Sequence, residues 1–292
     1  MTQFKDQTLL VTGAGGNLGR LAVEELLARG ANKIVAGTRD TAKLADLAAR
    51  GVEVRHLDFD DADSVAKAFA GVDRVLLVST VAHNRLEQQT KAVAAAKAAG
   101  VKYIAYTSAP NARPNADAGG INDHYWTEQA IAASGMDFTL LRNHIYADMT
   151  IVTAAQTIGS GQLFDATNGG GRNYVSRLDT ARTAAGALLS AEGKEIVDVT
   201  GPAPVTQEEV AALYAKLSGK PVTRIGLSAE QLAGGLAAAG LPPFMATLLV
   251  AFDLDAAAGH HAIVTDVVER FSGRKPETLE SFMTANKAAI VG

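Results

Sequence analysis

The sequence predicts an α/β fold, a doubly wound parallel sheet followed by a smaller mixed α/β lobe. Short apolar runs alternate with helical patterns about every 25 to 30 residues as far as Asn143, which is the rhythm of βαβ units. The run Val75–Val78 is apolar throughout, as expected of a parallel strand that is buried on both faces. Gly100 and Gly135 end the helices that precede the fifth and sixth strands.

Each element follows from a local pattern of apolar residues and turn formers. Strands are expected over 9–12, 33–38, 52–57, 72–79, 101–107 and 138–141, with helices over 20–29, 42–50, 63–70, 86–99 and 126–134. The rhythm then loosens, with helices expected over 148–158, 180–191 (capped by Asp179) and 207–218 (capped by Thr206), and strands over 195–199 and 222–225. We therefore divide the chain into residues 1–145, which form the sheet, and residues 146–292, a smaller lobe that shares a core with it.

The segment Gly13-Ala14-Gly15-Gly16-Asn17-Leu18-Gly19 forms the tight turn between the first strand and the first helix. Glycine permits positive φ, lets the backbone approach a ligand closely, and lets a helix pack tightly on a strand. The helix that begins there offers free N–H groups and a partial positive charge to a diphosphate. Because the segment follows a strand and opens a helix, it predicts a Rossmann-type dinucleotide site, and a purely structural turn is the alternative.

Arg39 stands at the end of the second strand, twenty positions after Gly19, where a dinucleotide fold meets the adenosine ribose. An acidic residue there would accept hydrogen bonds from the 2′-hydroxyl. Arg39, with Lys43 four residues later, instead suits a 2′-phosphate. We therefore favour NADP(H) over NAD(H). Two alternatives stay open: Asp40 could bind a hydroxyl if the turn shifts by one residue, and Arg39 could be an ordinary solvated arginine.

Composition argues against several classes of function. The 292 residues carry a net charge of −4 and no long basic run, so nucleic-acid binding has no electrostatic support. Cysteine is absent, which excludes disulfides and thiolate chemistry and fits a reducing compartment. No apolar signal segment precedes the first strand, so we expect a cytoplasmic protein.

The uncharged run Gln231–Phe252 is long enough to be considered as a membrane span. Gly240, Pro242 and Pro243 interrupt it. Proline and glycine break helices, so we expect two short helices that border an apolar pocket rather than a span.

Polar residues follow most of the predicted strands. Ligands of doubly wound sheets bind at the carboxyl ends of strands, so we expect one crevice to be lined by Gly13, Arg39, Asp58, Ser79, Ser108 and Asn143. We expect no metal, because the adjacent His260 and His261 point in different directions and have no acidic or sulfur partner at matching spacing. Ser79 and Ser108 lack the Gly-x-Ser-x-Gly elbow of a nucleophile.

Segments spread along nearly the whole chain carry a family resemblance. They are residues 12–19, 51–55 with Asp58, 68–72, 98–108, His124 with Thr127 and Glu128, 138–143 with Tyr146, 218–222 and 272–276. The chain resembles the NmrA-like, atypical branch of the short-chain dehydrogenase/reductases, in particular the type 2 NAD(P)H:quinone oxidoreductases and the triphenylmethane-dye reductases. The likeness is more specific for the subfamily than for the substrate.

This resemblance implies the positions of the cofactor and the substrate. Cofactor contacts are implied at Gly13, Gly16, Asn17, Leu18 and Gly19, with Gly15 between them, at Arg39 and Lys43, at Asp58 and Phe59 near the adenine, and at Ser79 and Thr80. The loop from Asn143 to Tyr146 is implied to lie beside the nicotinamide and the substrate. Relatives often carry a lysine after the Thr-Glu pair; Gln129 stands there in this chain, so no role for that lysine carries over.

The chain lacks the usual acid of short-chain dehydrogenases, a Tyr-x-x-x-Lys pair in which lysine lowers the tyrosine pKa. None of the six tyrosines has lysine four positions later, and Tyr125, nearest the expected place, has Gln129 instead. A quinone needs a strong acid less, because hydride addition yields a delocalised hydroquinone anion, and a cationic dye needs no proton. His124 and Tyr125 are candidates to donate a hydrogen bond to the substrate, and His83 is a candidate to face the pocket. A structural role at the start of a helix is the alternative for His124, and a solvated loop position is the alternative for His83.

We therefore expect an NADPH-dependent oxidoreductase that transfers hydride to a quinone or a similar planar, apolar or aromatic acceptor. Asn143, Tyr146, Tyr125 and His124 are expected at the reacting end of the site. Two alternatives stay open: an NmrA-type sensor that binds NADP without turnover, and a reductase of another carbonyl or activated alkene. The sequence also leaves a homodimer open.

Overall fold

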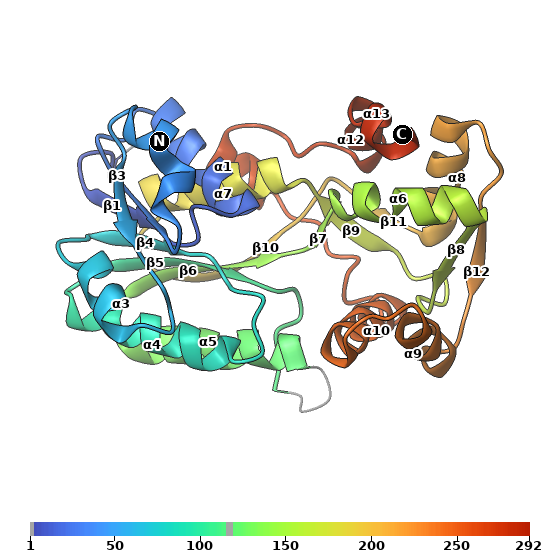
Figure 1. Ribbon diagram of the computed structural model, residues 1–292, viewed down its shortest axis with the longest axis horizontal. Helices are drawn as coiled ribbons and strands as arrows, with labels where there is room; N and C mark the ends of the chain where they lie inside the picture. Colours follow the sequence, from blue (N-terminus) through green and yellow to red (C-terminus); the bar gives the residue numbers. More distant parts are fainter. Residues whose placement is uncertain (1–2, 115–118) are drawn as a thin grey trace.

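Seven parallel strands form the central sheet of the computed structural model, which describes residues 3–114 and 119–292 (Figure 1). Their spatial order is β10 (Lys194–Val199), β6 (Asp137–Asn143), β5 (Tyr103–Ser108), β4 (Arg74–Leu77), β1 (Thr8–Val11), β2 (Lys33–Thr38) and β3 (Glu53–His56). Each neighbouring pair is parallel, so the predicted doubly wound sheet is confirmed. The order reverses between β1 and β4, and ligands of such sheets bind beside the carboxyl ends of the strands at this point.

Helices cover both faces of the sheet (Figure 1). One face carries α1 (Asn17–Ala28), α7 (Arg177–Ser190) and α11 (Val267–Ser272), and the other carries α3 (Ala62–Phe69), α4 (Arg85–Ala98) and α5 (Gly119–Ser134). Successive side chains of β1 alternate between the two cores, with Leu9 and Val11 on the α1 side and Leu10 on the other. Because both faces of the central strands are buried, runs such as Leu9–Val11 and Val75–Leu77 are apolar throughout, which made them visible in the sequence, whereas the edge strand β3 is partly exposed and mostly polar.

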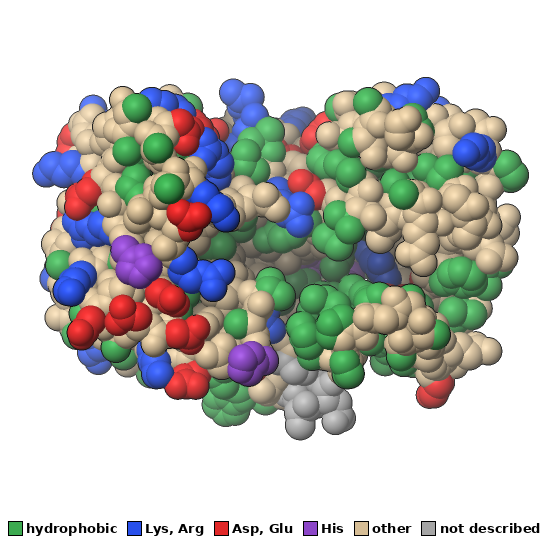
Figure 2. All heavy atoms as spheres, in the orientation of Figure 1, with side chains coloured by type: hydrophobic (Ala, Val, Ile, Leu, Met, Phe, Trp, Pro, Cys, Tyr) green, Lys and Arg blue, Asp and Glu red, His purple; other side chains and the backbone are tan. Residues whose placement is uncertain are grey.

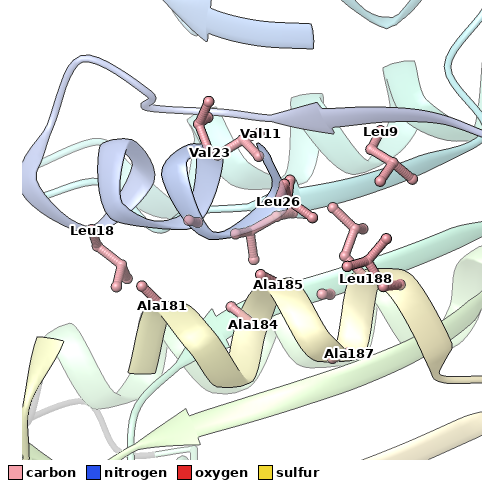
Figure 3. Close-up of a cluster of buried hydrophobic side chains, with 14 of the residues drawn as sticks. Leu9, Val11, Leu18, Val23, Leu26, Ala181, Ala184, Ala185, Ala187 and Leu188 are labelled. Atoms are coloured by element: carbon pink, nitrogen blue, oxygen red, sulfur yellow. The ribbon is translucent and has the colours of Figure 1, made fainter. Parts of the chain in front are cut away.

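Small side chains bring α1 and α7 close together (Figure 3). Ala181 and Ala184 of α7 lie opposite the larger Leu18 and Leu26 of α1, and all four are buried. Alanine leaves room for the leucines, so the two helices fill the layer above the sheet densely. This packing fixes the first turn of α1 relative to the end of β1.

The sheet is not contained within residues 1–145, as the expected division required. After β6 the chain enters the second lobe, returns through α7 and β10, and returns again at α11. β10 pairs with β6 from Lys194 to Val199 as the seventh strand. Placing 195–199 in the smaller lobe was wrong, because a short strand pattern does not tell which sheet the strand joins.

The second lobe is mixed α/β, as predicted. Its strands are β7 (Ile145–Tyr146), β8 (Gln162–Asp165), β9 (Arg172–Val175), β11 (Pro204–Val205) and β12 (Thr223–Gly226), which form a three-stranded sheet β11-β9-β7 and a two-stranded sheet β12-β8. Its helices are α6 (Met149–Ser160), α8 (Gln207–Ser218), α9 (Ala229–Ala238), α10 (Pro243–Ala257), α12 (Leu279–Ala285) and α13 (Lys287–Val291). Tyr174, Tyr214 and Phe282 belong to a hydrophobic cluster of this lobe, whereas α7 and α11, which also lie within residues 146–292, pack in the cluster that covers the sheet.

Several element boundaries differ from prediction for local reasons. α7 begins at Arg177, because the hydroxyl of Ser176 accepts the N–H of Asp179 and caps the helix in place of Asp179. The helix expected over 42–50 is a 3₁₀ turn, η1 (Thr41–Leu44), followed by a single α turn, α2 (Ala45–Ala48). α5 begins at Gly119 rather than Trp126, because its first turns lack the apolar spacing that would reveal a helix. Thr206 caps α8 as predicted.

The uncharged run forms two helices, α9 and α10, as expected. Pro242 is the N-cap of α10 and Pro243 its first residue, positions that do not require a proline N–H. None of the helices in residues 3–114 and 119–292 is long and apolar enough to cross a membrane. α10 lies at the junction of the two lobes, where Leu248 reaches Gly120 of α5 (Figure 1).

Candidate active site

The bend after β1 has the backbone that its glycines predicted. Gly13 has a φ of +61°, in the left-handed region that favours glycine. A Cβ on Gly15 would lie 2.6 Å from the Thr38 hydroxyl, and one on Gly19 would overlap the carbonyl of Gly13. The bend is therefore closed against β2 on one side and against α1 on the other. Its remaining exposed surface is the backbone of Gly13, Gly15 and Gly16.

The N-terminus of α1 is open to a ligand. Gly16 is its N-cap, and no side chain caps the helix. The first N–H groups of a helix have no partner within the helix, and the helix dipole adds partial positive charge at this end. The N–H of Gly16 already donates to the Gly13 carbonyl at 2.9 Å, so it is the amides of the first turn, from Asn17 onward, that suit a diphosphate. Leu18 is buried against α7 and holds the turn in place.

Arg39 and Lys43 lie beside this bend, and both residues are exposed. In the described residues, no carboxylate lies within 4.0 Å of the Arg39 guanidinium, although its carbonyl oxygen is 3.0 Å from Nδ1 of His56. The Asp40 carboxylate accepts the N–H of Ala42 and caps η1, and it is 4.0 Å from Nζ of Lys43. Two cations are therefore available to a phosphate, while Asp40 already has a structural task.

The ends of β3 and β4 are held by hydroxyl groups. Asp58 accepts the N–H of Asp60, and its own N–H donates to the Ser64 hydroxyl, so the turn before the buried Phe59 is fixed. After β4, the N–H of Ser79 donates to Oγ1 of Thr107 at 2.8 Å. The hydroxyl of Thr80 donates to Oε1 of Gln88 at 2.9 Å. These contacts leave Ser79 and Thr80 partly exposed at the switch point of the sheet.

Ser108 belongs to a buried charged network that sequence reasoning missed. Its hydroxyl donates to Oε1 of Glu128 at 2.6 Å, and Nη2 of Arg142 donates to Oε2 of the same carboxylate at 2.7 Å. Glu128 is 1% exposed, and its carboxylate holds the pKa of Arg142 above its usual range. The network ties β5, α5 and β6 together just below the expected reaction site. Glu128 four residues after His124 was the available signal, since that spacing places both on one side of a helix.

His124 faces the interior of the sheet half. Its Nδ1 is 2.7 Å from the hydroxyl of Tyr106, and its Nε2 is 3.4 Å from Nη1 of Arg85. Burial, with a smaller effect of the Arg85 charge, lowers the pKa of His124 to about 3, so the ring is neutral at physiological pH. The contacts are those of a packed core histidine. His83 lies exposed in the loop before α4.

Tyr125 is partly exposed on the next position of α5. Its ring meets Trp126 edge-on at a centroid distance of 5.1 Å. Gln129, one helical turn further, is exposed and uncharged. Gln129 therefore stands at the sequence position from which lysine lowers the tyrosine pKa in a Tyr-x-x-x-Lys pair.

Asn143 and Tyr146 are brought together at the end of β6. Nδ2 of Asn143 donates to the Tyr146 hydroxyl at 3.3 Å, while Oδ1 of Asn143 is buried without a partner. An unpaired buried carbonyl oxygen is costly, so this atom fits a donor such as the carboxamide of a nicotinamide. Burial raises the pKa of Tyr146, and Arg177 lies 5.1 Å from its ring centroid. This pair is therefore a candidate for a cofactor contact.

The surface is hollowed between the two lobes (Figure 2). Hydrophobic side chains gather over α10 at the edge of this hollow, and histidine and basic side chains are visible at its depth (Figure 2). An apolar wall with a few polar groups suits a small aromatic molecule.

A sequence model described as NAD(P)H-binding matches residues 13–191, from the glycine-rich bend to the end of α7. The chain belongs to this NAD(P)H-binding family. Quinone oxidoreductase 2 of Escherichia coli (strain K12) is 36% identical over 255 residues, which cover 86% of this chain and 88% of that protein. NAD(P)H azoreductase of Xenophilus azovorans is 27% identical over 286 residues, 97% of this chain and 99% of that protein.

Solved structures of the NAD(P)H-binding family have the same architecture. The NADPH-dependent quinone oxidoreductase QOR2 of Escherichia coli, complexed with NADPH, superposes with a TM-score of 0.89 at 33% identity and covers 95% of this chain and 99% of its own. Triphenylmethane reductase of Citrobacter sp., complexed with NADP(H), gives a TM-score of 0.85 at 31% identity over 95% of this chain and 100% of its own. The resemblance expected from the sequence is confirmed, and these relatives place the chain among NAD(P)H-dependent oxidoreductases.

Proposed function

We propose that this protein is an NADPH-dependent reductase that transfers hydride to a quinone or a similar planar acceptor. The observation that carries the proposal is the coexistence of an open dinucleotide site with a reaction site that lacks a Tyr-Lys acid. Gly16 leaves the N-terminus of α1 free of a side-chain cap, which forms the dinucleotide site. Gln129 stands four residues after Tyr125, where a Tyr-Lys acid would have its lysine. The relatives named above are quinone, azo and dye reductases, which agrees with an acceptor of this kind.

The phosphate of NADPH has a suitable place beside β2. Arg39 and Lys43 are exposed there, and among the described residues no carboxylate lies within 4.0 Å of the Arg39 guanidinium. A planar guanidinium binds phosphate with two parallel hydrogen bonds, and Lys43 adds a point charge. Lys43 has the Asp40 carboxylate at 4.0 Å, but the 2′-hydroxyl of NADH would offer the Arg39 guanidinium no anion, so NADPH is the favoured cofactor.

The residues at the reaction site orient the reactants and exclude water; they do not supply a strong acid. When bound, the reduced nicotinamide supplies hydride from its C4 atom. Asn143 offers its unpaired Oδ1 as an acceptor for the cofactor, and its hydrogen bond to the Tyr146 hydroxyl fixes the orientation of its side chain. The apolar residues of α10 exclude water from the acceptor, and the delocalised hydroquinone anion takes its proton from a weak donor such as Tyr125 or, once it leaves the site, from solvent.

A turnover assay with several classes of acceptor tests the proposal. NADPH oxidation is followed with 1,4-naphthoquinone, a cationic triphenylmethane dye, and a simple ketone. We expect steady turnover with the first two and a ketone rate lower by about a thousandfold, since general acid catalysis contributes up to about 10⁴-fold to carbonyl reduction. Tight NADP⁺ binding without turnover of any acceptor would instead indicate a sensor, and efficient ketone reduction would indicate an acid that this proposal lacks.

A further inference from the structure

Unpaired polar atoms gather where the second lobe meets the end of β6. Among the described residues, seven buried side-chain nitrogen or oxygen atoms have no hydrogen-bond partner. Four of these belong to one cluster: Nδ1 of His144, both ring nitrogens of His261, and Nε of Arg172. The two imidazole rings are 5.9 Å apart, and the backbone N–H of Asn173, next to Arg172, donates to the carbonyl of His261. Native proteins rarely leave such atoms unpaired, so the concentration in one place needs an explanation.

The donors and acceptors in this cluster are balanced. Nε2 of His144 lies 3.0 Å from a carboxylate oxygen of Asp198, so Nε2 carries the proton and Nδ1 accepts. Burial lowers the pKa of His261 to about 4, with smaller effects from neighbouring charges, so this ring is neutral and has one donor and one acceptor nitrogen. Arg172 pairs with Asp253 through Nη2 and keeps Nε–H as a free donor. The cluster thus needs two acceptors and two donors.

A hydroxyl group supplies both kinds of partner, because its O–H donates to one imidazole nitrogen while its oxygen accepts up to two hydrogen bonds; one acceptor nitrogen then remains for a second donor. A quinone carbonyl would only accept, and an ammonium group would only donate. A metal ion would satisfy the acceptors and repel the donors, and in residues 3–114 and 119–292 there is no group of three or more ligating side chains.

The cluster also lies in the right place for a bound aromatic molecule. His144 follows directly after Asn143, the residue expected beside the reacting ring. On the other side, the ring of Phe252 in α10 packs 5.7 Å from His261 and is itself partly exposed. The two imidazoles are therefore buried between Asn143 and Phe252, where they would face the inner end of a planar molecule bound beside α10.

We propose that His144, His261 and Arg172 form the polar end of the acceptor site and bind an aromatic hydroxyl group. The molecules that fit are hydroxylated quinones and the hydroquinones that their reduction yields. This inference rests on the proposed function, because it assigns the cluster to the far end of the same acceptor.

Anaerobic calorimetry with two probes tests the inference on the protein loaded with NADP⁺. 1,4-Dihydroxynaphthalene offers hydroxyl groups, whereas 1,4-dimethoxynaphthalene has the same rings and can only accept. We expect the dihydroxy compound to bind the wild type about tenfold more tightly, and we expect this preference to disappear in His261→Phe. His260→Phe, the same change at the exposed neighbouring residue, should keep the preference.

A stability measurement separates a binding site from a merely structural histidine. His261→Phe keeps a ring of similar size and removes two unpaired polar atoms, so its Tm should equal or exceed that of the wild type while the hydroxyl preference is lost. His144→Leu provides a second test with the same expected loss of preference. Equal binding of the two probes by the wild type, or an unchanged preference in both variants, would overturn the inference. Absence of NADPH oxidation with a retained hydroxyl preference would instead contradict the proposed function and leave the hydroxyl site standing.

Discussion

Gly19 has no room for a side chain, because a Cβ there would overlap the Gly13 carbonyl. We predict that Gly19→Ala lowers the free energy of unfolding by about 1–3 kcal/mol, the usual cost of forcing atoms into a packed contact, and weakens NADP⁺ binding as α1 moves from the bend. Chemical denaturation and calorimetry measure the two effects. Gly159→Ala is the matched control: it lies in α6 with open space around it and should stabilise the helix slightly. Equal stability of Gly19→Ala and wild type would contradict the geometry of the bend.

Arg39 decides the choice between NADPH and NADH in this account. Arg39→Asp replaces a phosphate partner with a carboxylate that repels phosphate and accepts hydrogen bonds from a ribose hydroxyl. We predict that the ratio of kcat/KM for NADPH to that for NADH falls by at least about tenfold, since one charged hydrogen bond is worth roughly 1.5–3 kcal/mol. Arg274→Asp makes the same charge change at another exposed arginine and should leave the ratio unchanged. An unaltered ratio in Arg39→Asp would remove the argument for NADPH.

Single residues were predictable from the sequence where backbone geometry dictated them. Gly13 needed a positive φ, and Gly15 and Gly19 needed the absence of Cβ, so their spacing revealed the bend. The environment of His124 was not predictable, because its burial depends on Arg85 and Tyr106 from two other elements. The unpaired oxygen of Asn143 is likewise visible only once β6 and β7 are packed.

At the scale of elements, α10 is tied to both lobes by two aspartates. Asp255 accepts Nη1 and Nη2 of Arg113, at 2.9 and 2.8 Å, from the loop after β5. Asp253 accepts the backbone N–H of Ala166 at 2.7 Å and pairs with Arg172, both in the second lobe. These contacts fix the apolar wall of the hollow relative to the reaction site.

We predict that Asp255→Ala loosens this wall. Arg113 is 34% exposed and can be solvated after the change, so the loss of stability should be about 1–3 kcal/mol rather than that of a fully buried pair. The KM for the quinone should rise severalfold, while the Kd for NADP⁺ stays the same because the bend after β1 is untouched. Glu280→Ala, which breaks the exposed pair with Lys216, should change neither quantity. A raised Kd for NADP⁺ with an unchanged KM would contradict the role of α10.

Elements were predictable from the sequence to the extent that local pattern determines them. The central strands of the sheet half were found because both of their faces are buried, the partly exposed edge strand β3 was found from its alternating pattern, and α8 was found from its Thr206 cap. The start of α5 was predicted too far along the chain, at Trp126 instead of Gly119. Its sequence has little amphipathic character, so tertiary packing rather than local spacing sets where the helix begins. The sheet to which β10 belongs is a long-range property, and no residue within Lys194–Val199 encodes it.

At the scale of the whole molecule, the chain crosses between the lobes several times, so they are held together by covalent connections as well as by α10. A ligand that binds the bend and the end of β6 should therefore stabilise the entire chain. We predict that NADP⁺ at about 100 times its Kd raises the free energy of unfolding by about 2.7 kcal/mol, with a corresponding rise in Tm. NAD⁺ at the same concentration should give a smaller rise. Scanning calorimetry measures both shifts in Tm. Equal shifts with the two nucleotides would contradict the proposed phosphate site.

Hydride transfer without a tyrosine acid is the central claim, and a single-turnover experiment tests it most directly. Protein loaded with NADPH is mixed with 1,4-naphthoquinone, and the loss of absorbance of the reduced nicotinamide is followed in the wild type and in Tyr125→Phe. The account predicts rapid oxidation in both proteins, with rates that agree within about threefold, because little of the barrier depends on general acid catalysis. No oxidation by the wild type, or a loss of about a hundredfold or more in Tyr125→Phe, would contradict it.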